Sequence, residues 1–124
     1  MIPKISDAEW QVMKLFWQHS PRTANEVIEA LKGKVDWNAQ TIRTLINRLV
    51  QKGALRHEKQ GRAYLYYAAV QEKHVKKAET KSFVSRVFDG SMKPMIATFL
   101  EETDLTDEEI DELERLLEEK KNQK

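Results

Sequence analysis

The sequence predicts a mainly α-helical protein that contains one small β-hairpin. Two observations point to this fold class: six segments repeat apolar residues at helical spacing, and the segment after the third is rich in Tyr and centred on a Gly. With 124 residues, 40% hydrophobic and 33% charged, the chain can form one domain with a helical appendage and is too apolar for disorder. Residues 1–70 carry 11 Lys and Arg against 6 Asp and Glu, whereas residues 71–124 carry 10 against 14. This asymmetry predicts a basic module for a polyanion and an acidic segment for self-association or solubility.

The first two predicted helices begin with capping boxes. Ser6 and Glu9 open a helix that runs to about His19, and Thr23 opens a second helix that ends before Gly33. The linker between them is short, so the chain must turn sharply. The residues expected on their buried faces are Trp10, Met13, Phe16 and Trp17 in the first and Val27, Ile28 and Leu31 in the second.

A third helix is predicted from Asn38, its N-cap, to Lys52, with Gly53 as the stop. Its outward face is polar, and residues 37–50 include no Asp or Glu. The apolar positions that repeat along its other face are Ile42, Leu45, Ile46 and Leu49.

Two short runs, residues 54–59 and 63–68, follow this helix and are joined by Gln60, Gly61 and Arg62. They are typical of a β-hairpin with a Gly at its tip. Both runs mix apolar residues on each face, so the register and the buried face stay open. Three helices followed by a hairpin with a basic tip is the order of a winged helix-turn-helix, which we expect over residues 1–70.

The sequence of residues 71–124 predicts three further helices, each with a narrow apolar stripe and many charged residues. The first starts at Glu72, the second near Ser91, and the third after Thr106, which forms a capping box with Glu109. Alone these helices would bury little surface, so we expect the stripes to pack against a second copy of the chain as a dimerisation domain. The residues expected in this homodimer interface are Phe83, Val87, Met95, Ile96, Phe99, Leu100, Ile110, Leu113, Leu116 and Leu117, with the final helix burying its Ile and Leu positions.

The third helix has the chemistry of a DNA-reading helix. An α-helix fits the major groove of B-DNA, where Asn and Gln pair with adenine, Arg pairs with guanine and a Thr methyl contacts thymine. A polar helix face is often merely solvated, but residues 37–70 contain six Lys and Arg and one acid, Glu58. The expected contacts with double-stranded DNA are Gln40, Thr41, Arg43, Thr44, Asn47 and Arg48 on the helix, and Lys59 and Arg62 on the hairpin.

Other site chemistries find little support in the sequence. Cys is absent, His19, His57 and His74 lie in different predicted elements, and the acids around Asp107 lack the spacing of an EF-hand. We therefore expect no metal, no cofactor and no catalytic activity. We also expect no membrane insertion, because no apolar run approaches the roughly 20 residues of a membrane span, and the N-terminus is unlike a signal peptide, which predicts a cytoplasmic protein.

The chain resembles the BlaI/MecI penicillinase repressors from end to end. The resemblance rests on residues 6–13 (SDAEWQVM), residues 41–49 (TIRTLINRL), Lys52 with Gly53, the hairpin end at Tyr66 and Tyr67, and residues 105–113 with Phe99. It implies a dimeric transcriptional repressor that binds inverted-repeat operators of β-lactamase or related antibiotic-resistance genes. It also implies release of DNA when a membrane sensor-protease pathway leads to a cut in the dimerisation domain. The family is cut at an Asn-Phe bond, and this chain has Thr98 and Phe99 there.

The alternative hypothesis is a winged-helix protein-protein interaction module without sequence-specific DNA binding. Such a module is expected to expose apolar or aromatic anchors on its docking face. The third helix instead presents Gln, Thr, Arg and Asn, which favours DNA.

Overall fold

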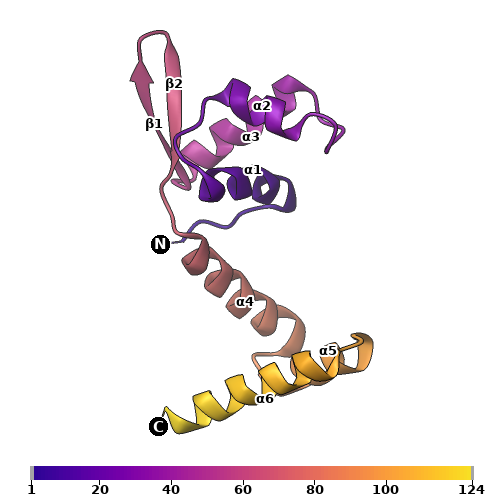
Figure 1. The fold of residues 1–124 in the computed structure, drawn as a ribbon. Helices are drawn as coiled ribbons and strands as arrows, with labels where there is room; N and C mark the ends of the chain where they lie inside the picture. Colours follow the sequence, from indigo (N-terminus) through magenta and orange to yellow (C-terminus); the bar gives the residue numbers. More distant parts are fainter. Residues whose placement is uncertain (1, 124) are drawn as a thin grey trace. The chain divides into compact units, whose positions relative to one another are not determined.

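The computed structural model describes residues 2–123 and is mainly helical with one antiparallel hairpin, which confirms the predicted fold class (Figure 1). The helices and strands lie close to the positions that the sequence predicts. Within the described residues they are α1 (Asp7–Gln18), α2 (Ala24–Leu31), α3 (Ala39–Gln51), β1 (Leu55–Gln60), β2 (Ala63–Ala68), α4 (Glu72–Phe88), α5 (Met92–Glu102) and α6 (Asp107–Asn122).

The chain divides into two compact units within α4, the first ending at Thr80 and the second beginning at Lys81. This division lies further along the chain than the boundary expected at residue 70. The first turns of α4 belong to the first unit because Val75 is buried in its core, and Val70 packs against that core.

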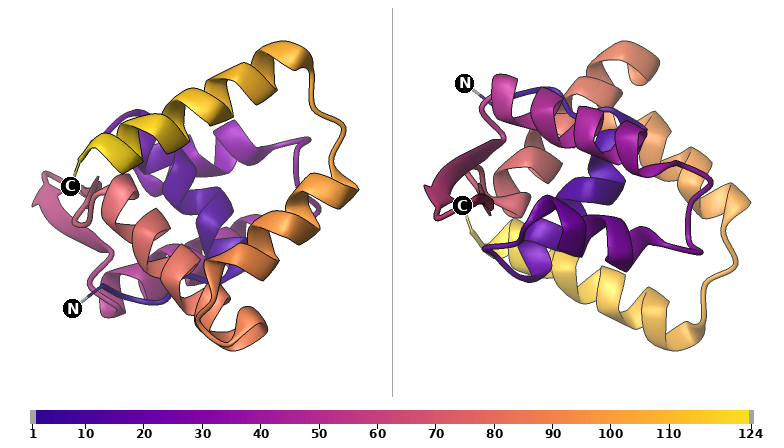
Figure 2. Two further views of the ribbon diagram at one scale, coloured as in Figure 1. Left: turned by 90° about the horizontal axis from the view of Figure 1, so that it is seen from below. Right: turned by 90° about the horizontal axis from the view of Figure 1, so that it is seen from above.

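The core of the first unit lies where α1, α2 and α3 pack together, and Figure 2 shows the three helices grouped with the hairpin beside them. The burial of each large apolar side chain contributes roughly 1.5–3 kcal/mol. Ile28, Trp10 and Trp17, expected on buried faces, are only half-buried. The most completely buried apolar side chains are Val12, Met13, Phe16, Val27, Ile42, Ile46, Leu49, Ala54 and Leu55.

The predicted helix caps are present. Ser6 and Thr23 each accept a hydrogen bond from the backbone N–H of a Glu three residues on, and that Glu accepts one from the cap's own N–H, forming two capping boxes. Asn38 Oδ1 accepts from Thr41 N at 2.8 Å. Each cap satisfies donors that the first turn leaves unpaired, so these side chains determine where the helices begin.

The structure defines the hairpin register that the sequence left open. Leu55 pairs with Ala68 and Gln60 pairs with Ala63, so Gly61 and Arg62 form the turn. Gly61 has a φ of 61°, a conformation that suits Gly in a two-residue hairpin turn. Leu55 and Tyr66 point into the core from the same face of the sheet.

The second unit leaves most of its apolar stripe uncovered in the single chain. Phe99 and Leu100 are about half exposed, and within the described residues α5 and α6 bury no side chain. The expectation that the final helix buries its apolar residues is therefore wrong for one chain, because its stripe faces an open groove. Ile110, Leu113, Leu116 and Leu117 are 40%, 36%, 60% and 66% exposed.

An apolar groove of about 370 Å³ lies between α5 and α6. Figure 2 shows these two helices diverging from the loop that connects them. Ile96, Phe99 and Leu100 line the groove from α5, and Ile110 and Leu113 are among the residues that line it from α6. A groove of this kind is the feature expected of a surface that is completed by another chain.

A partly buried ion pair connects the beginning of α1 with the end of α3. The Glu9 side chain is 2% exposed, and its Oε1 accepts from Lys52 Nζ at 2.5 Å and from Ser6 N at 2.8 Å. Lys52 Nζ also donates to the Lys4 carbonyl oxygen at 2.9 Å. Burial raises the pKa of Glu9, but the hydrogen bonds from Lys52 and Ser6 outweigh it, so the net pKa lies below its ordinary value of 4.5.

The substitution Glu9→Gln is expected to lower the free energy of unfolding at pH 7 by about 2 kcal/mol, because charge-assisted hydrogen bonds are lost. Because the pKa of Glu9 is lower in the folded state than in the unfolded state, its charged form stabilises the fold above pH 4.5. This stabilisation is lost as the pH falls through the folded-state pKa. Urea unfolding between pH 7 and pH 3 measures both effects. The variant should lose less stability than the wild type on acidification, whereas Glu29→Gln, at an exposed position, should follow the wild type. Parallel curves for wild type and Glu9→Gln would contradict this role for Glu9.

Candidate nucleic-acid interface

The polar face of α3 is open to solvent. Gln40, Arg43 and Asn47 are exposed, and so are Thr41 and Arg48. Residues three and four apart share a face of a helix, so Gln40, Arg43 and Asn47 lie beside one another. The opposite face carries the buried core residues, which fixes the rotation of α3 about its axis.

Thr44 differs from the other predicted contact residues because it is half-buried. Its hydroxyl donates to the Gln40 carbonyl oxygen at 3.0 Å, a hydrogen bond within the helix. With the hydroxyl proton used in this way, the methyl group is the part of Thr44 best suited to contact a base. This agrees with an apolar contact to a thymine methyl group.

Arg43 is held by a residue of α2. Its Nη2 donates to Asn25 Oδ1 at 2.6 Å, and both side chains are exposed. The two residues are 18 positions apart, so no periodic pattern in the sequence identifies the pair. Sequence reasoning therefore missed Asn25 as part of this surface.

The outer part of the hairpin carries cations and stacked rings. Lys59 and Arg62 are both exposed, Arg62 within the turn. The His57 ring stacks on that of Tyr64 at a centroid distance of 5.3 Å and shares its face of the sheet with Lys59. Glu58 lies on the other face and pairs with Arg56 at 2.9 Å. The acid is thus separated from Lys59 by the sheet.

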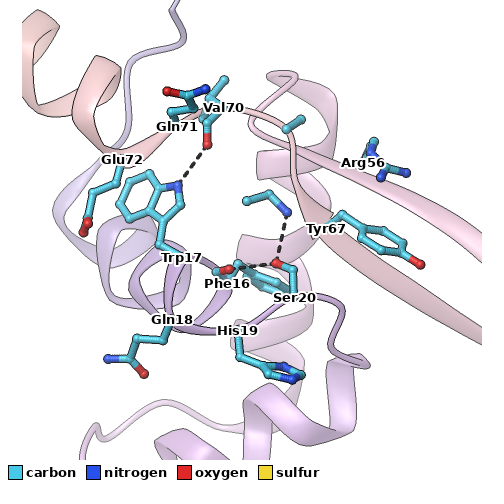
Figure 3. Close-up of a pocket in the computed structure, with 12 residues that line it drawn as sticks. Phe16, Trp17, Gln18, His19, Ser20, Arg56, Tyr67, Val70, Gln71 and Glu72 are labelled. Carbon is cyan, nitrogen blue, oxygen red and sulfur yellow. Dashed lines mark hydrogen bonds between the residues drawn. The ribbon is translucent and has the colours of Figure 1, made fainter.

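The base of the hairpin is attached to the end of α1 (Figure 3). Trp17 Nε1 donates to the Val70 carbonyl oxygen at 3.0 Å, and Ala68 N donates to Ser20 Oγ at 3.3 Å. Ser20 Oγ in turn donates to the Phe16 carbonyl oxygen at 2.7 Å. These contacts surround an open hollow of about 660 Å³. The hydrogen bonds hold the hairpin in a defined orientation relative to α1.

The linker between α1 and α2 adds to this attachment. Arg22 N donates to the Tyr66 carbonyl oxygen at 3.1 Å, and Tyr66 N donates to the Arg22 carbonyl oxygen at 2.9 Å. The linker therefore pairs with β2 at one bridge. The structure also distinguishes the three tyrosines of β2, because Tyr66 is buried, Tyr67 is half-buried and Tyr64 is exposed.

The described residues contain neither a cluster of metal ligands nor a membrane-spanning helix. Between residues 2 and 123, no group of three or more His, Cys, Asp or Glu side chains is placed to hold a metal ion. Among the helices described there, none is long and apolar enough to span a membrane.

A sequence model of the family described as "Penicillinase repressor" matches residues 5–119. The chain belongs to the penicillinase repressor family. It is 44% identical to the "Penicillinase repressor" of Bacillus licheniformis over 99% of this chain and 96% of that protein. It is 38% identical to "Methicillin resistance regulatory protein MecI" of Staphylococcus aureus (strain N315), over 94% of this chain and 95% of that protein. These findings confirm the predicted family. Penicillinase repressors are transcriptional regulators and not enzymes, as expected from the sequence.

Two solved structures of a penicillinase repressor resemble the first unit. One is the DNA-binding domain of the repressor BlaI, with 47% identity and a TM-score of 0.54 over 58% of this chain and 88% of that chain. The other is the monomeric form of Bacillus licheniformis BlaI in complex with the blaP half-operator, with 46% identity and a TM-score of 0.53 over 59% of this chain and 89% of that chain. These similarities support the winged-helix assignment of the three helices and the hairpin.

Proposed function

We propose that this penicillinase repressor binds operator DNA with α3 in the major groove and the hairpin against the sugar-phosphate backbone. The observation that carries the proposal is the exposed, acid-free face of α3 beside a hairpin that carries Lys59 and Arg62. The complex of a BlaI monomer with a half-operator supports one winged helix for each half-site. A repressor of this kind works where the DNA is, in the cytoplasm.

The second unit is proposed to join two chains into a homodimer that binds an inverted repeat. Its support is the apolar groove between α5 and α6, lined by Ile96, Phe99 and other apolar residues that one chain leaves exposed. Covering this surface with a second copy would remove a large apolar patch from water. Two linked winged helices also bind as a unit, because the second contact benefits from a high effective concentration. The names of the relatives favour genes of β-lactam resistance as the targets.

Selection from a random library of DNA duplexes at near-physiological salt tests this function. We expect sequencing of the bound duplexes to reveal an inverted repeat, because two identical winged helices read identical half-sites. The distance between the half-sites would also report how far apart the two copies of α3 lie. A library without enrichment would contradict sequence-specific binding and would favour the protein-docking alternative.

Alanine at Lys59 or Arg62 is expected to weaken binding to all duplexes alike. Each substitution removes one phosphate contact, so the slope of log K against log salt should become shallower by about 0.9. Fluorescence anisotropy at several salt concentrations measures the slope. Lys120→Ala, the same loss of charge on α6, is the control and should keep the wild-type slope. If Lys59→Ala and Arg62→Ala also keep it, the hairpin does not contact phosphates.

Release from DNA is proposed to follow a cut at the Thr98–Phe99 bond, initiated by a membrane sensor-protease pathway. Both residues lie on α5 and are exposed in the single chain, and Phe99 lines the apolar groove. A cut there would divide the dimerisation surface and leave the first unit intact. Immunoblots of cells treated with a β-lactam should show two fragments, one ending at Thr98 and the other beginning at Phe99. Derepression with the chain still intact would rule out this route.

A further inference from the structure

We infer that Asn25 is a positioning residue that holds Arg43 for base recognition and so determines part of the operator specificity. This inference rests on the proposed function, because it assumes that the polar face of α3 meets the major groove. The observation that leads to it is the 2.6 Å hydrogen bond from Arg43 Nη2 to Asn25 Oδ1. The bond crosses from the first turn of α2 to the exposed side of α3.

The chemistry of the acceptor suits a residue that must still bind DNA. Asn25 is neutral, so Arg43 keeps its full positive charge. An acid, Glu26, lies next to Asn25, but its Oε1 accepts from Thr23 N at 2.9 Å as part of the capping box of α2. The guanidinium is therefore ordered by an amide and is not neutralised by a carboxylate.

The geometry leaves most of the guanidinium available. Arginine has five N–H donors in a rigid plane, and the contact with Asn25 uses one nitrogen, Nη2. The other donors can still approach the O6 and N7 atoms of a guanine. Arg43 lies on the same helix face as Gln40 and Asn47, so holding its plane restricts which base pair it can reach.

A stability role explains this contact less well than a positioning role. Both side chains are exposed, and an exposed contact between flexible side chains contributes little to the free energy of folding. Ordering a long side chain before binding, in contrast, removes an entropy cost that would otherwise reduce affinity for the correct base. The contact therefore acts mainly on recognition.

Selection from one randomised duplex library tests the inference. It compares three variants of the full chain: Arg43→Ala, Asn25→Ala and the double variant. Arg43→Ala is expected to lower discrimination at one base pair of each half-site by about 5- to 150-fold. Asn25→Ala should lower discrimination at the same base pair by about 2- to 10-fold and leave the other positions unchanged. The double variant should be no worse than Arg43→Ala, because Asn25 acts through Arg43.

Asn25→Asp provides a second readout that a merely structural role would not change. The carboxylate keeps the acceptor and strengthens the bond to Arg43, but it adds a negative charge near phosphates. We expect discrimination at the Arg43 base pair to persist while affinity for all duplexes falls.

Asn122→Ala on α6 is the matched control for Asn25→Ala. Thermal unfolding should show equal stability for these two variants.

The outcomes separate this inference from the function on which it rests. If Arg43→Ala loses discrimination between base pairs and Asn25→Ala keeps it, the positioning role of Asn25 is wrong. The proposal that the polar face of α3 reads DNA would not be affected. A gain of affinity in Asn25→Ala would also overturn the inference, because Asn25 would then be holding Arg43 away from DNA. If Arg43→Ala itself leaves every base preference unchanged, the proposed reading by Arg43 fails, and the role of Asn25 fails with it.

Discussion

Replacement of Phe99 by Glu is expected to lower the affinity of the repressor for a full inverted repeat by about 10²- to 10⁴-fold, the advantage that two linked binding modules have over one. Phe99 lines the apolar groove between α5 and α6, where a second chain is proposed to pack. A carboxylate buried there without a partner strongly disfavours the dimer. Sedimentation equilibrium should show a monomer, and gel-shift titration should show the loss of affinity.

Binding to a duplex with a single half-site distinguishes loss of the dimer from loss of the fold. Phe99→Glu should bind this duplex like the wild-type monomer, because the substitution lies outside the first unit. Gln123→Glu adds the same charge to the same unit outside the groove and should remain dimeric. A Phe99→Glu protein that is monomeric and still binds the full inverted repeat as tightly as wild type would show that operator binding does not depend on the dimer.

The substitution Asn47→Asp is expected to reduce operator affinity by about 100-fold or more. Asn47 is exposed on α3, where residues 37–50 include no carboxylate. The change is nearly isosteric, so α3 keeps its shape, but the amide donor is lost and a negative charge faces DNA. A lost base contact costs about 1–3 kcal/mol, and repulsion between like charges costs several more.

Anisotropy titrations of the duplex recovered from the library, together with thermal unfolding, measure this effect. Asn122→Asp makes the same chemical change on α6 and should bind like the wild type. The unfolding temperature of Asn47→Asp should stay close to that of the wild type, because the side chain lies outside the core. Wild-type affinity in Asn47→Asp would show that this face of α3 does not meet DNA.

Much of the fold could be predicted because its signals are local. The side chains of Ser6, Thr23, Asn38 and Thr106 accept hydrogen bonds from backbone groups three residues away, so the starts of these four helices are determined within one turn. The polar face of α3 is equally local, since the 3.6-residue period fixes which residues share a side. The six contact residues predicted on the third helix therefore lie on α3. Predicting this required no knowledge of long-range contacts.

The hairpin register could not be predicted because both of its strands carry apolar residues on each face. The structure decides it by packing: Leu55 and Tyr66 are buried, and the bridge between Arg22 and Tyr66 joins β2 to the linker after α1. A shift by one residue would move every side chain to the other face. The register therefore decides which face of the sheet carries Lys59 and which carries Glu58.

The helices, the four side-chain caps and the acid-free face of α3 can be predicted from the sequence, because each depends on residues within a few positions of one another. The contacts of Glu9 with Lys52 and of Asn25 with Arg43 are known only from the three-dimensional structure, because the partners are 43 and 18 positions apart. It also showed that the apolar stripes of α5 and α6 stay uncovered in one chain. The physical reason is that periodicity fixes which side of a helix is apolar, whereas burial and long-range hydrogen bonds depend on what packs against that side.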